Sequence, residues 1–166
     1  MTMNGKLWFG FLAAAVLAGG CALNPLYRLP PGSSADEVRG VMGEPWASTR
    51  QADGGTRWVY PTGPLGRHTY VAEFGTDGRL RTFEDVLNDK GFARLRVGKT
   101  TEQEVEQLFG PAYRVTRFDR LRQTAWDYLF TDTWNYPAVF SVMFDDQGIL
   151  VSTMQQREFY GGERMR

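Results

Sequence analysis

Cysteine and histidine are almost absent from this chain of 166 residues, which has one of each, Cys21 and His68. A single cysteine excludes a disulfide within the chain. A single histidine excludes a His-rich metal site, and any catalytic triad would have to use His68 with a serine that no motif marks. The sequence also lacks a phosphate-binding Gly-Lys-Ser/Thr loop and a glycine-rich dinucleotide turn. We therefore expect no enzyme, no cofactor, no metal and no small-molecule substrate.

The chain also lacks net charge, with 19 basic and 19 acidic side chains. Removing residues 1–21 takes away only Lys6 and leaves 18 basic against 19 acidic side chains. This balance gives no general field for nucleic acid, which we do not expect as a partner. At 42% hydrophobic and 14% aromatic, the chain can still build a core.

No hydrophobic run is long enough to span a membrane comfortably; the N-terminal one, Leu7–Ala18 (LWFGFLAAAVLA), is short. Lys6 precedes this run, small residues follow it, and Cys21 comes next. This order is typical of a lipoprotein signal peptide over residues 1–21, in which the thiol of Cys21 is lipidated. The sequence therefore predicts membrane anchoring through Cys21.

Two features around Cys21 qualify this prediction. Ala18 lies three residues before the cysteine, where such signals usually have leucine, and Leu17 is one position early. Ordinary secretory cleavage beside an incidental cysteine is the alternative.

After the cysteine, residues 22–31 contain three prolines and no clear period, which predicts an extended tether.

Two later segments share one helix pattern. They are Gly32–Trp46 (GSSADEVRGVMGEPW) and Gly98–Arg114 (GKTTEQEVEQLFGPAYR). In each, a hydroxyl residue is followed three positions later by glutamate, which predicts a capping box, and a glycine ends the helix. The capping pairs are Ser34 with Glu37 and Thr101 with Glu104, and the final glycines are Gly43 and Gly110.

The residues after the two helices also correspond, which indicates an internal duplication. The step between equivalent positions is 67 residues from Val38 to Val105, 68 from Trp58 to Trp126 and 70 from Phe74 to Phe144. Both copies then have a hairpin signature, FGTDGRL and FDDQGIL. We therefore predict an α+β fold of two tandem modules, each a helix or helical pair packed on an antiparallel sheet of three to four strands.

The predicted boundaries are residues 32–87 for the first module, 88–97 for a linker with a helical turn, 98–157 for the second module and 158–166 for a flexible tail. In the strand Thr69–Phe74, alternation places Tyr70, Ala72 and Phe74 inward and Thr69, Val71 and Glu73 outward. In Thr124–Thr131, Asp127 indicates the solvated face. Modules of this size are marginal alone, so we expect the two to pack together; whether their sheets join edge to edge or stack stays open.

The helix segments, the Trp/Tyr strands and the FDDQGIL hairpin resemble the SmpA/OmlA (BamE-like) family of small outer-membrane lipoproteins. The first hairpin departs from this pattern, with Gly75 where the second has Asp145. The resemblance implies anchoring at the outer membrane facing the periplasm, consistent with Ala22, rather than aspartate, after Cys21. It also implies a role in envelope integrity or in the assembly of outer-membrane β-barrels, through binding of protein partners. The tandem arrangement is also similar to that of the β-lactamase inhibitor protein, which implies the alternative of blocking an enzyme with a concave sheet.

Three groups of residues are candidates for partner binding. Trp134, Asn135 and Tyr136 place two aromatics in a loop between strands, where they could bind a partner or fold back over the sheet. Arginines around the first hairpin of the second module, Arg117, Arg120 and Arg122 together with Arg114, could meet lipid phosphates or an acidic partner, or simply be solvated. Arg67 and His68 lie at a junction between loop and strand. The pair Asp145-Asp146 fits a tight turn better than a cation site.

Overall fold

The computed structural model describes residue 25 and residues 28–63 and 65–158, and they form an α+β fold with two four-stranded antiparallel sheets. The first half contains α1 (Ala35–Met42), β1 (Ala47–Arg50), β2 (Thr56–Pro61), β3 (Thr69–Phe74) and β4 (Leu80–Asp85). A short helix, α2 (Asp89–Phe92), follows. The second half contains α3 (Glu102–Phe109), β5 (Arg114–Phe118), β6 (Gln123–Thr131), β7 (Pro137–Phe144) and β8 (Leu150–Arg157).

The capping boxes predicted for the two eight-residue helices are confirmed. At the start of α1, the Ser34 hydroxyl accepts from the backbone N–H of Glu37, whose carboxylate accepts from the backbone N–H of Ser34. Thr101 and Glu104 make the same reciprocal pair at the start of α3. Each box satisfies N–H groups that the first helical turn leaves without partners.

The two sheets have the same topology, which confirms the internal duplication at the level of strand order. The first sheet has the order β1-β2-β3-β4 and the second β5-β6-β7-β8, and all neighbours are antiparallel. The registers also correspond, because Trp58 pairs with Ala72 and Trp126 pairs with Val142. Even the irregularity between the third and fourth strands recurs, at Phe74 and at Phe144. We call residues 32–87 unit 1 and residues 98–157 unit 2.

Two buried clusters form the core. One is formed by unit 1 and the preceding Leu29, and it contains Val38 of α1 together with Trp58, Tyr60, Ala72 and Phe74 of the sheet. The other crosses from unit 1 to unit 2. Its members are Val59, Val71, Val86 and Leu87 of unit 1, Phe92 of α2, Val105 and Phe109 of α3, and Tyr128, Phe130, Ala138, Phe140, Val142, Phe144 and Leu150 of unit 2.

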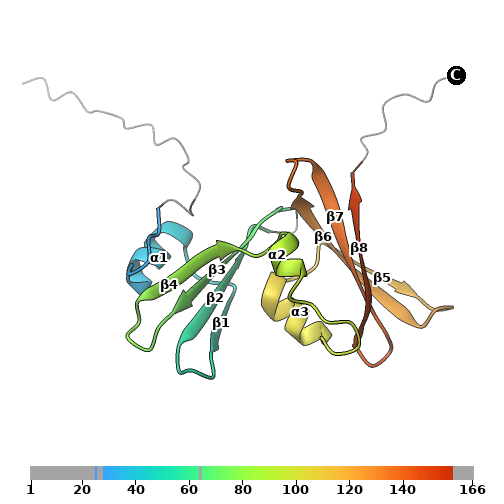
Figure 1. The fold of residues 1–166 in the computed structure, drawn as a ribbon, viewed down its shortest axis with the longest axis horizontal. Coiled ribbons are helices and arrows are strands. Elements are labelled where there is room, and N and C mark those ends of the chain that lie inside the picture. The colour runs from blue at the N-terminus through green and yellow to red at the C-terminus, as the bar shows by residue number, and fades with distance from the viewer. Residues whose placement is uncertain (1–24, 26–27, 64, 159–166) are drawn as a thin grey trace, which may run out of the picture.

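The sheets neither join edge to edge nor stack directly. Figure 1 shows α2 and α3 between the two sheets, with α1 on the far side of the first. Phe92 of α2 stacks on Phe140 of the second sheet at a centroid separation of 3.7 Å, and Val59 and Val71 of the first sheet belong to the same cluster. Both faces of the first sheet therefore take part in the core.

The predicted orientation of alternate residues on β3 was therefore wrong for its outward set. Val71 and Thr69 are 0% and 2% exposed, whereas we expected both to face solvent. The inward residues Tyr70, Ala72 and Phe74 are buried as predicted. The physical reason is that the second face of this sheet is covered by unit 2, which a pattern read within one module does not contain.

Several predictions concern residues beyond those described. The signal peptide with Cys21, most of the tether and residues 159–166 of the tail lie outside the described residues. Leu29, near the end of the predicted tether, is 3% exposed and belongs to the first core cluster. Within the described residues, none of the helices is both long and apolar enough to cross a membrane.

Candidate functional site

The loop between β6 and β7 presents the aromatic residues singled out from the sequence. Trp134 is 75% exposed and Tyr136 is 55% exposed, so the Trp134 side chain does not fold back over the sheet. Asn135 has a positive φ of 64°, a conformation that asparagine tolerates better than most residues. The loop therefore turns sharply and directs a large aromatic surface outward.

Asp132 organises this loop. Its Oδ1 accepts from the backbone N–H of Trp134 at 2.9 Å and of Tyr136 at 2.8 Å. Its Oδ2 accepts from Nε of Arg157 at 2.6 Å, and the Arg157 guanidinium also lies 4.7 Å from the centre of the Tyr136 ring. Because these contacts fix the backbone, the exposed ring of Trp134 is presented at low entropic cost to a partner.

The arginines near the β5–β6 hairpin do not form one uniform cluster. Arg117 and Arg122 both pair with Asp146 in the β7–β8 turn. The hydrogen bond from Arg117 is the main cause that holds the pKa of Asp146 below its usual value. Among the ion pairs of the described residues, none involves Arg120. Arg117 and Arg122 therefore connect neighbouring turns, and Arg120 has no charged partner among the described residues.

Arg67 contacts the other unit. Its guanidinium donates to the carbonyl oxygen of Phe130 at 3.1 Å and pairs with the carboxylate of Glu158 at 2.6 Å. Both side chains of this pair are about three quarters buried, with 24% and 28% exposure. The predicted binding residue thus makes contacts within the molecule.

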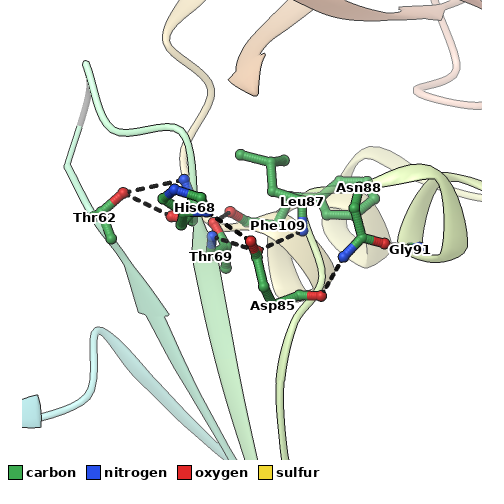
Figure 2. Close-up of polar contacts among 8 residues, drawn as sticks. All are labelled: Thr62, His68, Thr69, Asp85, Leu87, Asn88, Gly91 and Phe109. Carbon is green, nitrogen blue, oxygen red and sulfur yellow. Dashed lines mark hydrogen bonds and ion pairs between the residues drawn. The ribbon is translucent and has the colours of Figure 1, made fainter. Parts of the chain in front are cut away.

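His68 belongs to a polar cluster at the same junction (Figure 2). Its Nδ1 lies 2.7 Å from Oδ2 of Asp85, and the other oxygen of Asp85 accepts from the backbone N–H groups of Thr69 and Leu87. The hydrogen bond to Asp85 raises the pKa of His68, against the opposing effect of burial. Figure 2 also shows Thr69 beside Phe109, whose carbonyl oxygen accepts from the Thr69 hydroxyl at 2.8 Å.

This arrangement favours a structural role for the junction. Asp85 holds the start of β3 and the entry to α2, and His68 stacks on Tyr70 at a centroid distance of 5.8 Å. The space lined by both units at this point is only about 10 Å³. That space between the units is too small to hold a substrate.

The face of the second sheet that points away from α3 is an open groove of about 890 Å³. It crosses all four strands, and its apolar members include Phe118 and Met154, which are 42% and 56% exposed. Arg157 and Glu158 line the end of the groove toward the β6–β7 loop, and Leu121 lines the end at the β5–β6 hairpin. An exposed apolar groove of this kind is a candidate site for binding another molecule.

Asp127 lies at the base of this groove, and its predicted exposure was wrong. It is 6% exposed because Arg114 donates to it through Nε at 2.9 Å and Nη2 at 2.7 Å, while the hydroxyl of Ser141 donates at 2.6 Å. A buried carboxylate is stable only with such partners. The face is solvated around Asp127, but the carboxylate itself is covered by Arg114.

Other candidates for chemistry are satisfied locally. The carboxylate of Asp145 accepts from the backbone N–H groups of Gln147 and Ile149, as the turn interpretation predicts. Across the described part of the chain, no group of three or more His, Cys, Asp and Glu side chains is placed to hold a metal ion. Comparison with protein-family models and with curated proteins gives no match.

Sequence reasoning missed two features of this surface. The groove was missed because its members are spread over four strands and read as ordinary alternating residues. A pocket of about 590 Å³ beside Trp46 and Tyr60 in unit 1 was also missed. It is open because none of the described segments packs over these two residues, and the sequence does not indicate which residues a distant segment will cover. Comparison with the equivalent residues in unit 2 could have indicated it, since Tyr128 corresponds to Tyr60.

Proposed function

We propose that this chain is a non-catalytic lipoprotein of the outer membrane, anchored through Cys21 and facing the periplasm, that binds protein partners in the cell envelope. Its role is in envelope integrity or in the assembly of β-barrel proteins of the outer membrane. The single observation that carries the binding role is the open groove on the second sheet, with the preorganised Trp134 loop next to it. The anchor rests on the sequence pattern of residues 1–21.

Each unit is, in this proposal, one SmpA/OmlA-like module in which the helix packs on the sheet that follows it. The membership of Val38 and Trp58 in one cluster, and of Val105 and Tyr128 in the other, supports this assignment. So do the matched capping boxes and registers of the two units. The first unit is covered on both faces, which leaves the second sheet as the larger free surface.

The partner surface includes Trp134, Asn135 and Tyr136, with Arg120 as a cation for an acidic group. Trp and Tyr are the residues that most often dominate binding energy at protein interfaces. Arg117 and Arg122 stay in the proposal as positioning residues, because their pairs with Asp146 hold the hairpin at the end of the groove. Arg67 and His68 hold the junction between units and contribute indirectly.

A second function is favoured by the same face of the sheet. An inhibitor-like protein would cover an enzyme with this groove, and the four-strand width of the groove suits such a use. The two functions differ in what is bound: components of barrel assembly in the first case, and one soluble enzyme in the second. Neither requires a catalytic group in this chain.

Fractionation of cells that express wild type or Cys21→Ser tests the anchor. We expect the wild type with the outer membrane and the variant in the soluble periplasmic fraction. A wild type that is not membrane-associated, or a Cys21→Ser chain that stays with the membrane, would exclude anchoring through this residue.

A pull-down from solubilised envelopes, followed by mass spectrometry, tests the binding role. Recovery of barrel-assembly components supports the first function, and recovery of one soluble enzyme supports the second. Trp134→Ala should reduce recovery strongly, while Val97→Ala, at an exposed apolar residue away from the groove, serves as the matched control. Equal recovery by Trp134→Ala and wild type would remove the loop from the binding surface.

A further inference from the structure

Unit 1 docks on unit 2 through a surface at the end of α3. Pro61 and Thr69 of unit 1 and Phe109 and Tyr128 of unit 2 line the narrow space between them, which holds only about 10 Å³. The Thr69 hydroxyl donates to the carbonyl oxygen of Phe109 at 2.8 Å. The loop after β2 therefore fills the pocket beside the end of α3.

The duplication places an equivalent pocket at the end of α1. Met42 corresponds to Phe109, Trp46 to Tyr113 and Tyr60 to Tyr128, by the same 67- and 68-residue steps found in the sequence. The registers agree, because the backbone N–H of Trp46 donates to the carbonyl oxygen of Val59, and the backbone N–H of Tyr113 donates in the same way to the carbonyl oxygen of Asp127. In unit 1, however, this pocket is open, with a volume of about 590 Å³.

One side chain in this open pocket lacks a contact that its equivalent in unit 2 has. The Tyr60 side chain is buried, at 5% exposure, yet its hydroxyl has no hydrogen-bond partner among the described residues. The Tyr128 hydroxyl donates to the carbonyl oxygen of Gly110 at 3.2 Å. Trp46 is 48% exposed and its equivalent Tyr113 is 40% exposed, so the two units differ at the tyrosine hydroxyl and in the volume of the pocket. An orphan buried hydroxyl at an open pocket indicates a surface that something else covers.

The equivalent of the docking loop is also free. The loop after β6, residues 132–136, occupies the place in unit 2 that the loop after β2 has in unit 1. It carries Trp134, which is 75% exposed. One molecule therefore has an open pocket in unit 1 and a free loop in unit 2. The equivalent pocket and loop, at the end of α3 and after β2, already contact each other at the junction between the units.

We propose that a second copy of this chain supplies the missing contact, with the Trp134 loop of one copy inserted into the pocket beside Trp46 and Tyr60 of the next. The association is head to tail and repeats between copies the relation that the two units have within one. It also brings α1 of the next copy onto the open face of the second sheet, as α3 lies against the first. Asp36 of α1, 95% exposed, then faces the side of the molecule that carries Arg114, 60% exposed.

The contact between copies is weaker than the junction within one copy. At the positions of Val59 and Val71, which are buried against unit 2, the second sheet has Asp127 and Ser141. Less apolar surface is therefore buried, and the association is reversible. Because the two surfaces differ, it extends to a chain of copies or closes into a ring.

Cross-linking between two full-length single-cysteine chains tests this geometry. The natural cysteine is removed by Cys21→Ser, and the two differently tagged partners carry Glu44→Cys, at the pocket, and Thr133→Cys, in the loop, so that Trp46 and Trp134 stay in place. Every cross-link then joins two copies. We expect a link between positions 44 and 133, and none between position 133 and a Val97→Cys control. Absence of the 44–133 link, or a link that forms only between two copies of position 133, would overturn the proposal.

Sedimentation of the Cys21→Ser chain gives an independent measure. We expect the average mass to rise with concentration, and Trp134→Ala or Trp46→Ala to weaken association by about tenfold or more, as expected for a central aromatic at an interface. Val97→Ala should leave it unchanged. A concentration-independent monomer would reject self-association. The pull-down result would still stand, because it detects envelope proteins, which would then occupy the groove and the Trp134 loop in place of a second copy.

Discussion

Tyr60 and Tyr128 occupy equivalent positions in the two units, yet within the described part of the chain only Tyr128 has a hydrogen-bond acceptor for its hydroxyl, the carbonyl oxygen of Gly110 at 3.2 Å. Both side chains are buried, at 5% and 2% exposure. Burial raises the pKa of Tyr60 to about 12, so its hydroxyl stays protonated and retains a proton to donate. The same side chain thus has a structural contact in one unit and an unused donor in the other.

Removing the two hydroxyls should therefore have different effects on stability. Tyr128→Phe loses a buried hydrogen bond and should lower the free energy of unfolding by about 1 kcal/mol. Tyr60→Phe removes an unpaired buried hydroxyl and should leave stability unchanged or raise it by up to about 1 kcal/mol. Urea unfolding at a low protein concentration, where copies do not associate, measures both. Equal losses would show that Tyr60 has a partner in solution, such as an ordered water.

The pair His68–Asp85 should make stability depend on pH in one direction. The hydrogen bond to Asp85 raises the pKa of His68 in the folded state above its unfolded value of 6.5. The stabilisation is thus fully present below pH 6.5 and is lost as pH rises through the folded pKa. Since His68 is 47% exposed, we expect less than about 1 kcal/mol.

The measurement is the difference in unfolding free energy between wild type and His68→Gln, by urea titration from pH 5.5 to 8.5. The difference should be largest at the acidic end. A difference that grows toward alkaline pH would mean that the neutral imidazole is the form that the folded protein favours. Lys90→Gln, at an exposed residue with no ion pair among those of the described residues, is the control.

Asp132 should be the residue that keeps the Trp134 loop ordered. Asp132→Ala removes the acceptor for the N–H groups of Trp134 and Tyr136 and the partner of Arg157. We expect amide hydrogen exchange in residues 132–136 to accelerate, with the remaining strands of the second sheet unchanged. Asp119→Ala, in the β5–β6 hairpin where the side chain is 93% exposed, should leave that exchange as in wild type. Unchanged protection in Asp132→Ala would show that the turn holds without its carboxylate.

The local structure could be predicted from the sequence because its causes are local. Ser34 and Glu37 form a capping box through groups three residues apart, and the 67-residue step to Thr101 and Glu104 repeats it. The hairpins and the inward phase of Phe74 and Phe144 follow for the same reason. Each depends on neighbours in sequence or on adjacent strands.

The burial of residues that are covered by the other unit could not be predicted in this way. Val71 is buried because α2, α3 and unit 2 cover that side of the first sheet, and no residue within β3 records that fact. Asp127 looks like a solvated residue until Arg114 and Ser141 are placed around it. Of the candidate site, the aromatic loop at Trp134 was identified from the sequence with its exposure left open, whereas the groove and the pocket beside Tyr60 depend on the relation between units.

Thr69 should link the stability of the two units, because the residue is 2% exposed and its hydroxyl donates to the carbonyl oxygen of Phe109 across the junction. Thr69→Val keeps the shape and removes the donor. The acceptor then loses its partner in a buried place, and we expect a loss of about 1–3 kcal/mol in the free energy of unfolding. Thr82→Val, at an exposed residue whose hydroxyl donates to Glu73 away from the junction, should change it by less than about 0.5 kcal/mol.

The same titration reports on cooperativity. Because one buried cluster includes Val71, Phe92 and Phe140 from both sides of the junction, the wild type should unfold in a single transition seen equally by fluorescence and circular dichroism. Thr69→Val should lower the urea concentration at the midpoint and keep a single transition. If the Thr69 hydroxyl is the main contact between the units, the transitions seen by fluorescence and by circular dichroism should separate instead. Two separate transitions in the wild type would contradict a shared core, since each unit would then be stable by itself despite its small size.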